Sequence, residues 1–333
     1  MTVASPYIPG HYLLHLMETG LLPPATTRHL HQHLEKTGVD TLQLSDARLA
    51  PQSLEALLQA WPEIQPQALA IAFGRQVTLT SQGGLSLLLM TAPTLRKALQ
   101  LTAFLPLLTN AASLHYFENP QGGHLQIQPH SGAPLLDKVL ALYACAALEQ
   151  LAVLLTGKPC HCQVQVAMEY GASLPLATRN IAPQWQWDAV VSTVTLPNDM
   201  LELPCQHADS ITHAHLLQQC ENLLARKQHA EPVVTRIRHL LAQGKVEPDQ
   251  ETVARALNMS RSTLKRHLAR EHTNFQAVLT AFRKEKAIRL LLGSTLSLQD
   301  IAEQLGYSDQ TNFSHAFKQW SGMTPGQFRK HSQ

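Results

Sequence analysis

The feature that most constrains this chain of 333 residues is a pattern of apolar residues in its C-terminal segment 298–330. These residues recur every three or four positions on both sides of Gly306, which predicts two short amphipathic helices joined by a tight turn. Thr324-Pro325 predicts the start of a third helix. The polar face of the second helix consists of Thr311, Asn312, Ser314, His315 and Lys318. A short polar helix held outward by a helical pair is how many proteins place side chains in the DNA major groove.

A second helical pair of the same kind precedes this one. Asp249 and Ser260 predict the two helix starts, because both residue types cap helix N-termini. The outward face of the second helix carries Arg261, Ser262, Lys265 and Arg266. Charges on an isolated helix are usually only solvated, but the repetition of the pair favours a role in binding.

A long helix is predicted between the two pairs. Thr273-Asn274-Phe275-Gln276 has the form of a capping box, and the apolar spacing continues to Leu292. At 1.5 Å per residue this connector spans roughly 27 Å, near the ~34 Å between successive major-groove faces on one side of a duplex. One chain can therefore lay two recognition helices into adjacent major-groove segments of double-stranded DNA.

Donor and acceptor chemistry suggests a role for each of these side chains. Asn312 can pair with an adenine edge, and Arg266 or Lys265 with guanine O6 and N7. His315 can donate to a guanine or a phosphate, more strongly when it is protonated. Phosphate contacts, which fix register but not sequence, are expected from Arg261, Ser314 and Lys318.

The same segment carries a resemblance to a known family. From about residue 232 onward it resembles the AraC/XylS-type bacterial transcription regulators, which implies a double helix-turn-helix domain that binds an asymmetric half-site. His315 stands where the family most often has arginine, and His272 where it usually has glycine; histidine tolerates a left-handed cap better than most residues. The matching positions are Ile301-Ala302, Leu305-Gly306-Tyr307, Phe313-Ser314, Ala316-Phe317-Lys318, Trp320, Gly322, Thr324-Pro325 and Phe328-Arg329.

The N-terminal two-thirds predict an α+β domain. The expected helices cover residues 12–17, 24–36, 51–61, 66–73, 95–108 and 135–155. The expected strands cover 113–117, 124–128 and 161–168, with one more in 185–196 and a hairpin turn at 119–123. This region is similar to the arabinose-binding-type effector domain found in a branch of the same family, and the similarity implies that it senses a small molecule. The similar segments are Thr41-Leu42-Gln43-Leu44-Ser45-Asp46, Ala56-Leu57-Leu58, Gly84-Leu85 and Ala92-Pro93-Thr94-Leu95-Arg96-Lys97-Ala98.

Aromatic and basic residues supply candidates for the effector site. Aromatic rings could line a pocket, and arginines could meet a carboxylate. The alternative is that the aromatic residues are ordinary core and the basic ones are surface. The candidates are Phe73, Arg75, Arg96, Phe104, Tyr116 and Tyr143.

Residues 206–230 predict a linker helix with one apolar side. This helix either docks on its own domain or pairs with its copy in a second subunit. Its apolar side consists of Ile211, His215, Leu216, Leu217, Cys220, Leu223 and Leu224.

Charge is unevenly divided along the chain. Residues 231–333 hold 15 lysines and arginines against 9 acidic residues, whereas the net charge of the whole chain is only +2. A basic C-terminal third suits a module that meets phosphate. The first residues have neither the basic flank nor the apolar core of a signal peptide, and an odd number of cysteines favours reduced thiols. Both observations favour the cytoplasm, and the apolar stretch 139–155 is expected to be a buried helix.

Parts of the chain are compatible with two other kinds of function. Cysteines and histidines at 160–162 and 205–220 could make a metal- or thiol-responsive regulator, but their spacing fits no closed zinc pattern. Pro159-Cys160-His161-Cys162 faintly resembles the methyl-accepting motif of alkyltransferases but lacks its arginine, and nothing nearby lowers the cysteine pKa. The sequence contains no nucleophile elbow, P-loop or zinc-protease motif. An enzyme, a metal site and a cofactor are therefore not expected.

The sequence thus predicts an α+β effector-sensing domain at 1–205, a linker at 206–230, and an all-α domain at 231–333 with two helix-turn-helix motifs joined by a long helix. The expected function is a cytoplasmic, sequence-specific DNA-binding transcriptional regulator, an activator, controlled by a small-molecule effector. RNA polymerase and a second copy of the chain are further expected partners, and no membrane is.

Overall fold

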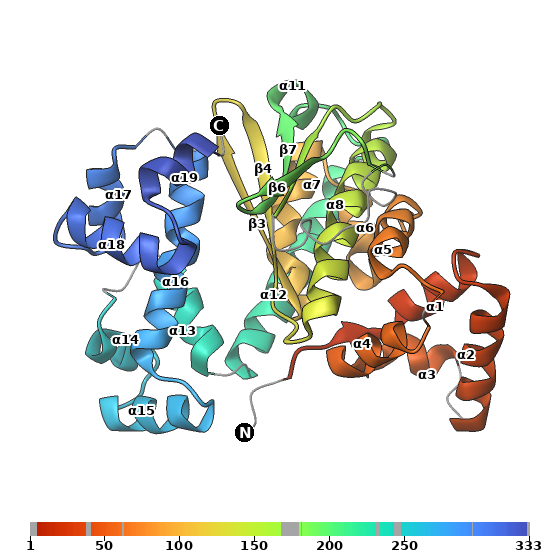
Figure 1. Ribbon diagram of the computed structural model, residues 1–333, viewed down its shortest axis with the longest axis horizontal. Coiled ribbons are helices and arrows are strands. Elements are labelled where there is room, and N and C mark those ends of the chain that lie inside the picture. Colours follow the sequence, from red (N-terminus) through yellow and green to blue (C-terminus); the bar gives the residue numbers. More distant parts are fainter. Residues whose placement is uncertain are drawn as a thin grey trace. The chain divides into compact units, whose positions relative to one another are not determined.

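The computed structural model describes residues 5–331 except 38–40, 62, 168–179, 181, 231–232, 243–247 and 295. The chain forms two compact units (Figure 1), one of residues 6–222 and the other beginning at Leu223. The boundary between them falls within a helix, α12 (Ser210–Ala230). The predicted start of the DNA-binding domain, residue 231, lies outside the described residues.

A five-stranded sheet with strand order β3-β4-β7-β5-β6 forms part of the N-terminal unit. β3 (Ala112–Asn119) and β4 (Gly122–Pro129) form the predicted hairpin, and the Asn119 carboxamide accepts the backbone N–H groups of Gln121 and Gly122 in its turn. The expected strand at 161–168 is β5 (Gln163–Ala167), and Met168 lies outside the described residues. Segment 185–196 contains two strands where one was expected, β6 (Gln186–Ala189) and β7 (Ser192–Pro197).

The central helix of this unit is α8 (Pro134–Thr156). Its length and composition would allow it to cross a membrane, yet Ala141, Leu142 and Cys145 have no exposed surface because they pack inside the unit. α5 (Pro66–Arg75) approaches it closely, since a Cβ on Gly74 would lie 2.6 Å from the Tyr143 carbonyl oxygen. The expectation of a buried helix here is confirmed.

Shorter helices surround α8 and the sheet. Prolines begin α2, α4 and α5 as predicted, because their fixed φ suits the first helical turn. The helix predicted at 95–108 is α only over its first six residues and continues as a 3₁₀ segment, Leu101–Leu107, which contains Pro106. The small strands and the short helices α3, α6 and α11 were not predicted. These elements are β1 (Ile8–Pro9), α1 (Gly10–Glu18), α2 (Pro24–Thr37), α3 (Thr41–Asp46), β2 (Arg48–Leu49), α4 (Pro51–Gln59), α6 (Ser86–Met90), α7 (Leu95–Gln100) and α11 (Asn198–Leu201).

The predicted apolar side of α12 is only partly buried. His213 and Cys220 are buried, and the His213 ring lies 3.2 Å from the Leu88 carbonyl oxygen. Ile211 and Leu223, in contrast, are 83% and 53% exposed, so these two members of the apolar side are not covered within this chain.

The C-terminal unit is all-helical, as predicted. α13 packs with the first helical pair around Ile237, Leu264 and Leu268, and the second pair packs around the fully buried Phe313 and Phe317. The helices are α13 (Val233–Ala242), α14 (Gln250–Ala256), α15 (Arg261–Arg270), α16 (Phe275–Gly293), α17 (Leu298–Gln304), α18 (Gln310–Ser321) and α19 (Pro325–His331). An α+β unit followed by two helix-turn-helix motifs on a long helix is the fold class expected from the sequence.

The capping box predicted at Thr273 is wrong. His272 adopts a left-handed conformation with φ of 54°, as expected, and the Thr273 N–H donates to the Leu268 carbonyl at 3.0 Å. Thr273 therefore completes the end of α15 in a Schellman arrangement. The next residue, Asn274, caps α16 by accepting the N–H of Ala277 at 2.9 Å.

Candidate nucleic-acid interface and effector cavity

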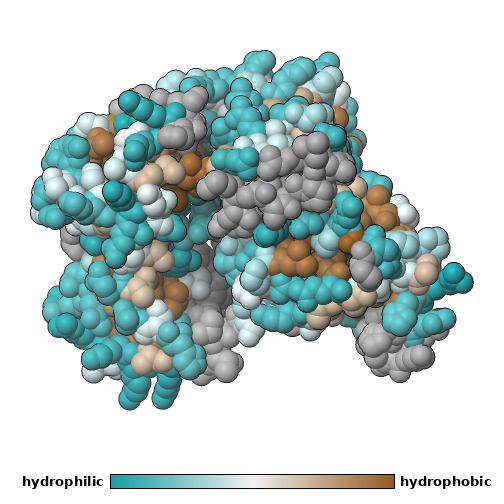
Figure 2. All heavy atoms as spheres, viewed as in Figure 1, coloured by the Kyte–Doolittle hydropathy of each residue, from teal (hydrophilic) through white to brown (hydrophobic). Residues whose placement is uncertain are grey.

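The first outward face lies on α15. Ser260 caps the helix by accepting the Thr263 N–H at 3.1 Å, as predicted. Leu264 and Leu268 have no exposed surface and fix the inner side. In Figure 2 the surface where α15 lies, at the lower left, is mostly hydrophilic. The predicted binding residues on this helix are all exposed: Arg261, Ser262, Lys265 and Arg266.

A carboxylate fixes α15 to the rest of the unit. Glu271, directly after the helix, accepts the backbone N–H groups of Val233 and Val234 at 2.7 and 3.0 Å. These N–H groups begin α13 and would otherwise lack partners. The end of α15 is therefore locked to α13, which keeps its outward face in a fixed direction.

The second outward face lies on α18. Asp309 caps this helix by accepting the Asn312 N–H at 2.7 Å, and Phe313 and Phe317 fill the core behind it. The side chain of Asn312 also donates to Ser308 Oγ and Asp309 Oδ2 at 2.9 and 2.8 Å. Of the predicted binding residues on α18, Ser314 is half-buried, and the exposed ones are Thr311, Asn312, His315 and Lys318.

The turns of the two motifs have the same construction. Asn258 in the first and Gly306 in the second adopt left-handed conformations, with φ of 57° and 74°. In each turn the N–H of the following residue donates back, at 2.9 Å, to the Ala254 or the Ala302 carbonyl. This pattern is the Schellman motif, which ends a helix and satisfies its free carbonyls. Both recognition helices are thus presented by the same local geometry.

The connector α16 also holds the second motif in place. Arg283 donates to the Gly306 carbonyl at 3.1 Å, and Lys286 donates to the Gln304 carbonyl at 2.8 Å. Both cations lie at the C-terminal end of α17, where the helix dipole favours positive charge. The Arg283 guanidinium also lies 4.9 Å from the centre of the Tyr307 ring.

Sequence reasoning missed one basic residue on the first face. Arg270 is exposed in the last turn of α15, one helical turn beyond Arg266. The spacing of four residues would have placed both on one helix face.

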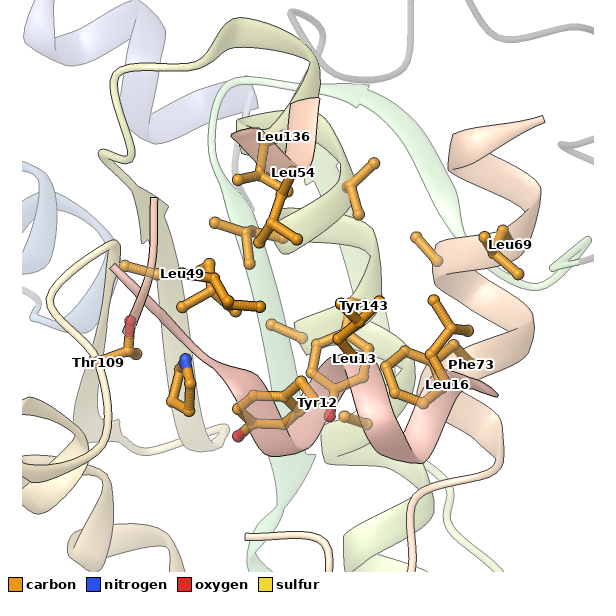
Figure 3. A pocket seen from close by; sticks show the side chains of 18 of the residues that line it. Tyr12, Leu13, Leu16, Leu49, Leu54, Leu69, Phe73, Thr109, Leu136 and Tyr143 are labelled. Carbon is orange, nitrogen blue, oxygen red and sulfur yellow. The ribbon is translucent and has the colours of Figure 1, made fainter. Parts of the chain in front are cut away.

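The N-terminal unit contains a cavity of about 210 Å³ between α1, α4, α5 and α8. Figure 3 shows Tyr12, Phe73 and Tyr143 together at one end and Leu54 and Leu136 at the other. Small-molecule sites are typically concave and lined mainly by apolar side chains, as this cavity is.

Two of the six effector candidates line this cavity, Phe73 and Tyr143. Their rings lie 5.2 Å apart, centre to centre. The others do not line it. Arg96 instead forms ion pairs with Glu118 and Glu202. The remaining candidates that lie away from the cavity are Arg75, Phe104 and Tyr116.

The polar groups of the cavity lie mainly at its aromatic end. The Tyr12 hydroxyl donates to Gln82 Oε1 at 3.3 Å, and burial raises the pKa of Tyr12 to about 12. The Tyr143 hydroxyl is buried and has no hydrogen bond of standard geometry within the described chain, although Gln82 is its neighbour. Burial, and then Tyr12, hold the pKa of Tyr143 well above its ordinary value. Both phenols are therefore neutral at physiological pH.

The cysteines and histidines do not gather into a metal site in the part of the chain that is described. The five cysteines are free thiols. Cys162 Sγ lies 3.5 Å from Glu149 Oε1, and the neighbouring Cys160, burial and Glu149 all raise the pKa of the Cys162 thiol. The same contact with Cys162 lowers the pKa of Cys160, so the expectation that nothing nearby lowers it is wrong.

Two rigidly presented polar helices in tandem define a DNA-binding protein of the double helix-turn-helix class. Comparison with known families agrees: a helix-turn-helix domain family matches residues 253–331, and the arabinose-binding N-terminal domain of AraC transcription regulators matches residues 29–205. The chain belongs to the AraC family of transcription regulators. Members of this family are regulators and not enzymes, so the methyl-accepting alternative is not favoured.

Several curated proteins are similar to this chain. The ornithine utilization regulator of Pseudomonas aeruginosa is 30% identical over 277 residues, covering 79% of this chain and 78% of that protein. The urease operon transcriptional activator of Escherichia coli is 36% identical over 114 residues, 33% of this chain and 38% of that protein. The crystal structure of the regulator CdpR from Pseudomonas aeruginosa aligns with 84% of this chain and 96% of that chain at 24% identity. The TM-score of this alignment is 0.36.

Proposed function

We propose that this regulator binds operator DNA by placing α15 and α18 in two successive major-groove segments of one duplex. The observation that carries the proposal is the pair of outward polar faces, each backed by fully buried apolar residues and each presented by a Schellman turn. The connector α16 has 19 residues, which corresponds to about 28 Å at 1.5 Å per residue. This length is close to the ~34 Å between groove faces.

Base reading is proposed for Arg266 or Lys265 on α15 and for Asn312 and His315 on α18. Asn312 would first have to release Ser308 and Asp309, because its amide N–H₂ donates to both. Arg261, Ser314 and Lys318 would contact phosphates, and Ser262 and Thr311 lie beside them on the same faces.

We further propose that the N-terminal unit senses a small molecule in the cavity between α1, α4, α5 and α8. The match to an arabinose-binding regulator domain and the size of the cavity support this proposal. Effector binding would shift the population toward the arrangement in which α15 and α18 engage DNA, and only a difference in affinity between the two states can do so.

The proposals for the remaining partners are based on the family and on the exposed apolar side chains of α12. The similarity to a transcriptional activator supports an activator that works with RNA polymerase in the cytoplasm. A second copy of the chain is proposed to pair through α12, because Ile211 and Leu223 present large apolar side chains to solvent. Sedimentation of the full chain with both residues changed to glutamate tests this pairing, and an unchanged dimer would refute it.

Selection of DNA from a random pool by the full-length protein tests the central proposal. We expect an operator with two conserved elements about one helical turn apart, since each motif reads its own groove segment. Substituting Arg266 and Asn312 together by alanine should abolish this selection. Undiminished affinity of that double variant for the selected operator would show that α15 and α18 are not the docking faces.

A further inference from the structure

The lining of the effector cavity is uncharged in the described chain. None of the residues that line it is aspartate, glutamate, lysine or arginine. Most are leucines and alanines, many of them on α1, α4, α5 and α8, and Figure 2 shows a hydrophobic patch on the surface of the N-terminal unit. A charged ligand buried in such surroundings would lose its hydration without gaining an ionic partner.

The two arginines expected to meet a carboxylate lie away from the cavity. Arg96 donates to Glu118 and Glu202, so its charge is already balanced by two carboxylates. Arg75 ends α5 but does not line the cavity. An amino acid or a sugar acid is therefore a poor fit to this site.

Hydrogen bonding is concentrated at one end. Thr109 lines the cavity, but its hydroxyl donates to the Tyr7 carbonyl at 2.5 Å and accepts the Ala111 N–H at 3.1 Å. The Tyr143 hydroxyl, in contrast, is buried without a hydrogen bond of standard geometry in the described chain, and it shares its neighbour Gln82 with Tyr12. Buried hydroxyls normally form a full hydrogen bond, so an oxygen or nitrogen atom of a ligand at this end would complete the bonding of Tyr143.

We infer that the effector is a neutral, lipid-like molecule, with an apolar body along the leucine-lined part of the cavity and one uncharged polar group at Tyr143 and Gln82 (Figure 3). The inference rests on the proposed sensing function and specifies its ligand. About 210 Å³ is several times the roughly 30 Å³ that one water molecule occupies in the liquid. Apolar cavities smaller than this bind small hydrocarbons.

The test is displacement of N-phenyl-1-naphthylamine, a neutral apolar fluorophore, from the full-length protein. The competitors are 1-decanol, decanoate and decylammonium at pH 7.5, which share a chain and differ in charge. Decanol should displace the fluorophore at a concentration at least about tenfold below either ion, because only the ions bury an unpaired charge.

Three variants assign the binding to the cavity. Ala144→Leu, in the part of α8 that lines the cavity, should weaken the binding of both the fluorophore and decanol. Tyr143→Phe should weaken the binding of decanol more than that of the fluorophore. The Tyr116 hydroxyl donates to Glu118 at 2.7 Å outside the cavity, so Tyr116→Phe should change the binding of neither ligand. Gln82→Lys, at a half-exposed position, should move the preference toward decanoate. This last variant keeps the test decisive if the α8 variant misfolds.

The outcomes separate the two proposals. Tighter binding of decanoate or decylammonium, weakened by Ala144→Leu, would overturn the neutral ligand and leave the sensing function standing. If the fluorophore does not bind, or if no cavity variant changes its binding, both the neutral-ligand inference and the sensing function are overturned.

Discussion

At the scale of single residues, the two proposed reading faces differ in how their side chains are engaged. Arg266 on α15 is exposed and makes no hydrogen bond or ion pair in the described chain. Asn312 on α18 is committed to Ser308 and Asp309. Contacts through α15 therefore begin from a free side chain, whereas contacts through Asn312 require an exchange of partners.

Replacing Arg266 by alanine should lower operator affinity by about 1–3 kcal/mol and relax the preference at one base pair. Fluorescence anisotropy with the operator and with single-base variants measures both effects. The matched control is Arg255→Ala, an exposed arginine of α14 that pairs with Glu251. Equal losses in the two variants would mean that only overall charge matters.

The turn at Gly306 provides a test of backbone geometry. Its φ of 74° is strained for any residue with a Cβ, and a Cβ would lie 3.1 Å from Arg283 Nη2. Gly306→Ala should therefore lower the free energy of unfolding by roughly 1–2 kcal/mol. Gly326→Ala, in α19 with nothing within 4 Å, should instead raise it by about 0.5–1 kcal/mol. Urea unfolding followed by circular dichroism would show opposite shifts, and parallel shifts would contradict the argument.

At the scale of elements, the sequence predicted the helix starts better than the helix ends. Asp249 and Ser260 were identified as caps because a single side chain with the right oxygen suffices. Thr273 was misassigned because it is the last residue of a Schellman motif. The left-handed conformation of His272 was expected, but the capping-box pattern of residues 273–276 gave no sign that Thr273 completes the end of α15. The 3₁₀ continuation beyond Gln100 was missed for a related reason, since periodicity alone does not distinguish the two helix types.

The aspartate caps of the two motifs make the C-terminal unit sensitive to acid. Backbone N–H donors, from Thr252 to Asp249 and from Asn312 to Asp309, hold the pKa of each carboxyl below its ordinary value. The pKa of each carboxyl is lower in the folded chain than in the unfolded chain, where it is about 3.9. The charged carboxyls therefore stabilise the fold at pH values above this one. This contribution is lost as the pH falls through that value and below it.

Changing both caps to asparagine should therefore lower the melting temperature near pH 7, and the loss should shrink as the pH falls below about 3.9, at constant salt. Asparagine still caps a helix but carries no charge. Thermal unfolding across this pH range measures the difference. Glu303→Gln, an exposed carboxylate of α17 that caps no helix, is the control. A constant difference between the double variant and the original chain at all pH values would contradict the role of charge.

At the scale of the whole molecule, the DNA-binding unit was readable from the sequence and the cavity was not. Each recognition helix is continuous in sequence, so its apolar spacing and caps specify its outward face. The cavity is lined by residues from Ile8 to Leu151, spread over many elements, and no local pattern marks such a set. Phe73 and Tyr143 were found among general aromatic candidates, whereas the expected arginines proved to lie away from the cavity.

Effector binding and operator binding are expected to be coupled, and thermodynamic linkage requires each to change the affinity of the other by the same factor. If 1-decanol in the cavity changes operator affinity by some factor, operator DNA must change decanol affinity by the same factor. Couplings of this kind typically amount to about 5–150-fold. Titrating the operator at saturating decanol, and decanol at saturating operator, measures the factor twice. Ala144→Leu should bring both factors to unity, because it narrows the cavity and leaves the residues of α15 and α18 unchanged. Decanol that binds through the cavity yet leaves operator affinity unchanged would mean that the cavity is not the site through which this regulator is controlled.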